Sequence, residues 1–176
     1  MQDSTGTGLG GQQDTTGQGG DPDDFSGNWQ FATDSGGFFA GTFDTAVIIK
    51  DSTIWGSGGQ MLYMVGFTNA STDSAITLIM YLPNGVVAPG TYNNQSAPPA
   101  NGSLFAFNFT TGNGDPIYEA IPSSTTPIGN VTITISSYDN STHVVTGTFS
   151  GTAEDYAYDG KTIGIANGNF TATVTQ

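Results

Sequence analysis

The chain has 176 residues and a formal net charge of −13, because 15 acidic residues stand against only two lysines. Such a chain cannot neutralise a run of phosphates, so nucleic-acid binding is excluded as an expected function, and anionic lipid surfaces should repel it. The absence of cysteine excludes disulfides, thiol catalysis and cysteine-based zinc sites.

The first 24 residues differ in composition from the rest. They are rich in Gly, Gln, Thr and Asp, and Leu9 is their one sizeable apolar side chain after Met1. Such a segment cannot bury enough surface to offset its ordering entropy, so we expect a flexible tether over 1–24 and one folded domain over 25–176. We expect no transmembrane helix and no signal peptide, and the opening residues resemble a Met added to a processed start.

From Phe25 onward, short apolar runs alternate with turn residues. The 26 glycines and 20 aromatic residues suit strands and turns. Period-two alternation predicts half-buried strands, and the breaks between them are PNG, TGNGDP, DNST and YDGK. We therefore expect an all-β domain of about 9–11 antiparallel strands, either a sandwich or a flattened barrel, with a lipocalin-like barrel as the alternative. The runs are NWQFAT, FFAGTF, TAVIIK, QMLYMVGFTN, AITLIMYL, LFAFNF, VTITISSY and FTATVT.

The stretch from 143 to 174 collects the scarce charged residue types. It contains the only histidine, His143, together with Lys161 and a small acidic group. Alternation accounts for most of the stretch, which predicts a β-hairpin with a polar tip. A serine triad would need His143 as its base, but we expect this residue to flank a turn in contact with solvent.

The last half of the chain contains a characteristic order of strand and turn motifs. Its residues are Gly90–Tyr92, then Gly129, Val131, Ile133 and Thr134, then Val145 and Gly147–Ser150, then Ile165, Gly168 and Phe170. This order resembles a family of small secreted or lipid-anchored all-β proteins of Bacteroidetes-type bacteria, which has no assigned function. The resemblance implies export, usually on a lipidated N-terminal cysteine that is followed by a polar tether. This chain has the tether and lacks the cysteine, and Ala166 departs from the usual Thr.

Five Asp-Ser/Thr triplets resemble the O-glycosylation signal of exported proteins in those bacteria. Turn-forming Asp-Ser/Thr pairs explain each of them equally well, so both interpretations stay open. The candidate acceptors are Ser4, Thr15, Thr45, Ser52 and Ser74.

Two hydrolase mechanisms depend on pairs of acidic side chains. Glycosidases use two carboxylates about 5 to 10 Å apart, and the only glutamates, Glu119 and Glu154, lie far apart in the sequence. Asp34-Ser35-Gly36 matches the aspartic-protease signature, but that mechanism needs two such aspartates and a second loop is missing. A turn is the simpler interpretation of this triplet.

Two kinds of ligand site remain as hypotheses. Calcium needs six to eight oxygens from loops, and acidic residues cluster at Asp21, Asp23 and Asp24 and again on the last hairpin, although neither cluster has EF-hand spacing. Glycans stack on exposed aromatic side chains, and aromatic residues at loop positions are candidates for such a site. The calcium candidates of the hairpin are Glu154, Asp155 and Asp159, and the glycan candidates are Trp55, Tyr156 and Tyr158.

We therefore expect a non-enzymatic domain outside the cytoplasm: an outer-membrane lipoprotein, a cell-surface protein or a secreted protein. Its role would be binding or structural, with a glycan or another surface protein as partner, no cofactor other than calcium, and membrane contact only through a lipid anchor. Two alternatives stay open, namely a carbohydrate-binding module of a glycan-uptake system and a hydrolase that uses an Asp/Glu pair.

Overall fold

A computed structural model describes residues 27–50, 59–69, 71–95, 102–108, 117–122, 126–155 and 160–175. This part of the chain contains ten β-strands, which confirms the predicted all-β class and strand number. It contains no helix that could cross a bilayer. The tether expected over residues 1–24 lies outside the described residues, as does the tip of the last hairpin.

The ten strands differ widely in length, from four residues in β5 and β7 to 13 in β2. Their bounds are β1 Asn28–Thr33, β2 Phe38–Lys50, β3 Gln60–Thr68, β4 Ser71–Leu82, β5 Gly90–Asn93, β6 Ser103–Asn108, β7 Ile117–Ala120, β8 Asn130–Asp139, β9 Val144–Asp155 and β10 Thr162–Thr173.

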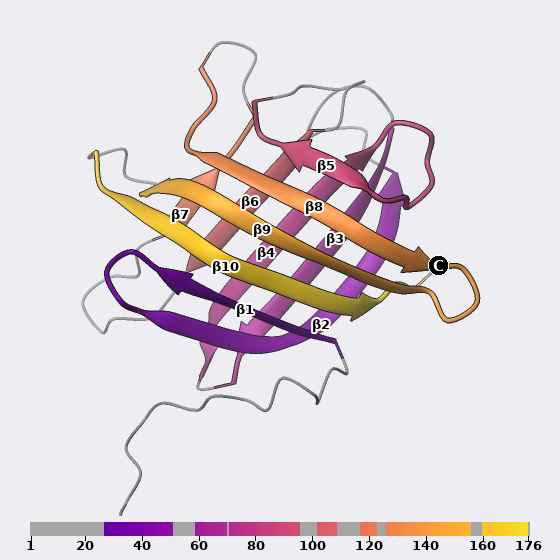
Figure 1. The fold of residues 1–176 in the computed structure, drawn as a ribbon, viewed down its shortest axis with the longest axis horizontal. Helices are drawn as coiled ribbons and strands as arrows, with labels where there is room; N and C mark the ends of the chain where they lie inside the picture. The colour runs from indigo at the N-terminus through magenta and orange to yellow at the C-terminus, as the bar shows by residue number, and fades with distance from the viewer. Residues whose placement is uncertain are drawn as a thin grey trace, which may run out of the picture.

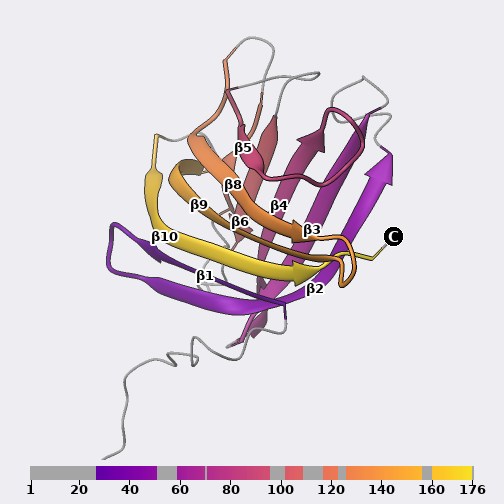
Figure 2. The ribbon, with the colours of Figure 1, turned by 45° about the vertical axis from the view of Figure 1, so that its right-hand side comes forward.

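Eight strands form a closed antiparallel ring. The order around it is β10-β1-β2-β3-β4-β6-β7-β9, and β9 pairs with β10 to close it. Figure 1 shows β8, β9 and β10 crossing in front of β3, β4 and β6, and Figure 2 shows the space between these two layers. The structure is thus a flattened barrel, one of the architectures that the alternation predicts.

β2 is one long strand where the sequence suggests two. The runs FFAGTF and TAVIIK join across Asp44, which is skipped in the pairing between Phe43↔Gly66 and Thr45↔Val65. A bulge of this kind bends a strand sharply. The first half of β2 therefore pairs with β1 in the front layer, and the second half continues with β3 in the back layer.

β7 and β8 lie end to end along the same side of β9. Tyr118 and Glu119 pair with its last residues, and β8 takes over the pairing at Thr152. The chain between them leaves the wall at Ile121 and returns at Ile128, where the two residues exchange backbone hydrogen bonds of 2.9 and 3.1 Å. The ring is therefore closed between β7 and β9 by two residue pairs, and we call this short contact the seam.

Side chains fill the interior of the ring. An eight-stranded barrel has room either for packed side chains or for one small ligand, and here aromatic rings occupy the centre. Phe31 is the hub, because its ring centroid lies 5.0 Å from that of Phe107, 5.8 Å from Phe149 and 6.0 Å from Trp29. The inward positions predicted for the last hairpin, including Ile165 and Phe170, are buried as expected.

Candidate functional site

The back wall of the barrel is apolar on both sides. Leu62, Met64 and Leu78 of β3 and β4 belong to the main core. The alternate residues of the same strands point out of the barrel, yet Met61 and Ile79 form the centre of a second cluster with Tyr81. An antiparallel strand with one solvated face would carry polar residues at these outward positions.

The outward residues are in register across four strands, and we call them the apolar face. Met61 pairs with Tyr81, and Tyr63 pairs with Ile79, which in turn pairs with Leu104. The face consists of Val47 and Ile49 on β2, Met61, Tyr63, Val65 and Phe67 on β3, Ala75, Thr77, Ile79 and Tyr81 on β4, and Leu104 and Ala106 on β6.

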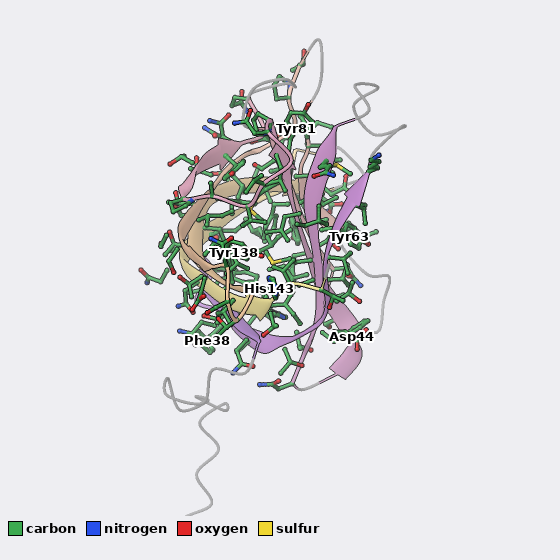
Figure 3. The ribbon with its side chains drawn as sticks, turned by 90° about the vertical axis from the view of Figure 1, so that its right-hand side faces the viewer. Phe38, Asp44, Tyr63, Tyr81, Tyr138 and His143 are labelled. Atoms are coloured by element: carbon green, nitrogen blue, oxygen red, sulfur yellow. The ribbon has the colours of Figure 1, made fainter. Side chains whose placement is uncertain are left out.

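No member of the apolar face carries a charge, although the chain has a net charge of −13. From strand spacings, the face measures roughly 14 Å by 20 Å. Met61 is fully buried and Tyr81 is 6% exposed, whereas Tyr63, Val65 and Phe67 are half-buried. Figure 3 shows Tyr63 on the side of the wall away from the core, and Asp44 lies on the same side. Exposed apolar patches on a monomer often serve as contact surfaces, and here the half-buried members of the face form its accessible part.

The opposite half of the outer surface is polar. The outward positions of β8 and β9 carry hydroxyl side chains, which are paired in register, as in Thr134↔Thr148 and Thr132↔Ser150. On β10, Asn169 and Thr171 continue the same rows. The barrel is therefore amphipathic in cross-section, with a hydroxyl-rich half in front and the apolar face behind.

A carboxylate pair lies at the seam. Glu119 of β7 and Glu154 of β9, the only glutamates of the chain, are direct cross-strand partners. Side chains at such positions have Cβ atoms about 4.5 to 5.5 Å apart, and like charges there repel. The two glutamates lie far apart in the sequence, and a non-local strand pairing brings them together.

The two glutamates have different environments. The backbone N–H of Gly129 donates to Glu154 Oε1 at 3.2 Å. Glu119 Oε2 is buried and accepts no hydrogen bond, and burial raises the pKa of the Glu119 carboxyl above its usual range. Burial therefore disfavours the charged form of Glu119, and this lessens the repulsion expected between two carboxylates at paired positions.

Asn94 holds the chain where it leaves and rejoins the wall beside the seam. Its side chain is 1% exposed, and its Nδ2 donates to the carbonyls of Ile128 at 2.7 Å and Gly129 at 3.1 Å. Its Oδ1 accepts from the Val131 N–H at 3.0 Å. One amide thus makes hydrogen bonds to three backbone groups where the chain rejoins the wall.

His143 lies in the β8–β9 turn, as expected. It has a left-handed backbone, with φ of 57°. Its Nδ1 is 3.1 Å from the hydroxyl of Tyr138, beside which Figure 3 shows it, and its carbonyl accepts from the Val174 N–H at 2.9 Å. Asp34 also lies in a turn, in which the Gly37 N–H donates to Thr33 Oγ1 at 2.9 Å. Both residues have structural surroundings that account for their positions.

The calcium candidates are only partly described. Glu154 and Asp155 are neighbours on β9, so their side chains leave opposite faces of the strand. Asp159 lies outside the described residues, together with Asp21, Asp23 and Asp24. Within the ranges that the structure describes, no group of three or more acidic or His side chains could hold a metal ion.

Of the remaining candidate residues, two lie within the described part of the chain and the others lie outside it. Thr45 is half-buried on β2, and Ser74 on β4 is 7% exposed, so a glycan would have to reach Ser74 before folding. The other positions predicted for glycan binding or O-glycosylation lie outside the described residues. These are Trp55, Tyr156, Tyr158, Ser4, Thr15 and Ser52.

The sequence contained the signal for the apolar face. Within QMLYMVGFTN, both alternating sets are apolar, which is typical of a strand covered on both sides. Comparison with known proteins adds no relative, since neither family models nor curated proteins nor solved structures match the chain.

Proposed function

We propose that this chain is a non-enzymatic docking domain that binds another protein through the apolar face. The observation that carries the proposal is the contrast between the two halves of the outer surface. Water contact suits the hydroxyl rows of β8 and β9, whereas uncharged Tyr63, Val65 and Phe67 gain free energy when a partner covers them. An export role agrees with the family resemblance of the last half of the chain, so the partner would be another surface or secreted protein.

A photo-crosslinking experiment tests the proposal in the producing cells. A benzoylphenylalanine replaces Tyr63 on the apolar face or Thr134 on the hydroxyl-rich half, and adducts are identified by mass spectrometry. We expect one discrete protein adduct from position 63, abolished by Val65→Lys and reproduced with the purified partner. Equal adducts from both positions, or an adduct from position 63 that Val65→Lys leaves intact, would refute docking through this face.

The glutamate pair supports a second candidate, a hydrolase that uses an Asp/Glu pair. Glu119 would be the proton donor, because burial raises its pKa, and Glu154, which accepts from the Gly129 N–H, would be the second carboxylate. Hydrolysis of aryl glycosides by the wild type, lost in both Glu119→Gln and Glu154→Gln, would favour this candidate. Wild-type inactivity on such a panel would favour docking.

Carbohydrate binding stays a third proposal. It depends on Trp55, Tyr156 and Tyr158, and a glycan array probed with the wild type and with a Trp55→Ala variant tests it. Saturable binding of one glycan class that the variant loses would support it.

A further inference from the structure

A groove opens in the barrel wall beside the apolar face. β1 begins at Asn28, which pairs with Thr42, and its next residue, Trp29, pairs with Phe170 of β10. Beyond this point, no described residue forms a strand between β2 and β10. They meet again where Thr175 N–H donates to the Ala46 carbonyl at 2.8 Å. Figure 2 shows the end of β10 beside the curved part of β2.

The groove encloses about 360 Å³, which lies in the range of small-ligand sites. Its deep part is apolar, since Ala46 and Ala172 are 6% and 1% exposed and Phe43 packs against the core. Hydroxyl groups and one carboxylate surround this apolar part. The lining residues are Gly27, Phe43, Asp44, Thr45, Ala46, Val47, Ala172, Thr173 and Thr175.

Asp44 provides the only charge in this lining. It is exposed and is the residue that the β2 bulge leaves out of the pairing with β3. The whole chain, at −13, adds a long-range attraction for cations. A lone carboxylate does not meet the needs of calcium, but it suits an alkyl chain that ends in a single positive charge, as in lysine or arginine.

We propose that the groove is an anchor pocket for a basic side chain of the docked partner protein. The aliphatic part lies along Ala46, Val47 and Ala172, and the cationic end reaches Asp44. Thr45 and Val47 point outward in register with Val65 and Tyr63 of the apolar face. A partner on that face thus reaches the groove without leaving the surface, which is why the inference rests on the proposed function.

Butylammonium, a mimic of the lysine side chain, is the probe for this pocket, and butanol is its neutral control. Both are titrated into the full chain labelled with ¹⁵N. We expect saturable amide shifts for butylammonium, in the millimolar range typical of so small a ligand, at residues 44–47 and 172–175. Asp44→Asn should weaken binding about threefold to tenfold, whereas Asp34→Asn, an exposed aspartate in the β1–β2 turn, should not change it.

Several outcomes would overturn the proposal. These are equal shifts with butanol, equal losses in Asp34→Asn and Asp44→Asn, or no saturable shift at the groove. Shifts that appear only in a Phe25→Ala variant would also overturn it, since the chain's own N-terminal segment would then fill the groove. Ala106→Lys separates this site from docking, because β6 lies at the edge of the apolar face away from the groove. This variant should block the partner and leave butylammonium binding intact.

Discussion

At the scale of single residues, Gly129 is a tightly constrained position beside the seam. Its φ of 63° is in the left-handed region, and an added Cβ would lie 2.7 Å from the Thr152 carbonyl oxygen and 2.9 Å from that of Glu119. Both atoms belong to paired backbone, which cannot move aside cheaply. Gly160 has a similar φ of 83°, but nothing lies within 4 Å of its Cβ position.

We therefore expect Gly129→Ala to destabilise the protein by about 2 to 4 kcal/mol, the sum of left-handed strain and overpacking. Gly160→Ala should cost about 1 kcal/mol, from the strain alone. Urea denaturation of both variants measures the difference. Equal losses would show that the close approach at Gly129 is relieved by a backbone shift.

At the scale of elements, the seam is sensitive to pH. Burial raises the folded-state pKa of Glu119 above the usual 4.5 of a glutamate. The folded state therefore binds more protons than the unfolded state between these two pKa values, and its stability falls as pH rises through that window.

In Glu119→Gln this contribution is absent. Thermal melts from pH 4 to 8 should show the variant gaining stability relative to the wild type as pH rises through this window. A Glu119→Gln profile parallel to that of the wild type would mean that the carboxyl is solvated in both states.

The β8–β9 turn responds to pH in the opposite sense. Asp139 Oδ1 accepts from the Ser141 N–H at 2.7 Å and from the Ser141 hydroxyl at 2.6 Å, and these bonds lower the pKa of Asp139 to about 2. The stability that they contribute is present above pH 3.8 and is lost as pH falls toward 2.

We expect Asp139→Ala to lower the melting temperature at pH 7 and to have little effect at pH 2. Asp139→Asn keeps an acceptor oxygen, so it should recover part of the loss, and its stability should lack the pH-dependent contribution of Asp139 between pH 2 and 4. A constant deficit of Asp139→Ala at every pH would contradict the assignment.

At the scale of the whole molecule, the barrel has two unlike halves. Replacement of Val65 by Lys places a charge in the apolar face, and Thr134→Lys places the same charge among hydroxyls. We expect Val65→Lys alone to shorten retention on a hydrophobic-interaction column, because the half-buried side chains around it supply the apolar contact. Equal retention of the two variants would show that the apolar face is closed to solutes.

The sequence predicted the features that depend on local interactions, and it did not predict those that depend on contacts between distant residues. Alternation is local, so it located the strands and inward residues such as Phe149 and Phe170. The sequence did not indicate that FFAGTF and TAVIIK form one strand, β2, because an aspartate at a bulge is also typical of a turn. Pairing of Glu119 with Glu154 was also missed, since it depends on how β7 meets β9 across 34 intervening residues, 120–153.

The seam also affects how the protein meets other copies of itself. Two residue pairs join β7 to β9, whereas nine residue pairs join β3 to β4. If the seam parts, the edge of β7 exposes backbone donors and acceptors that can pair with a strand from another chain. Protonation of Glu119 favours the closed ring, so mild acid should protect the protein from strand exchange and neutral or basic conditions should promote it.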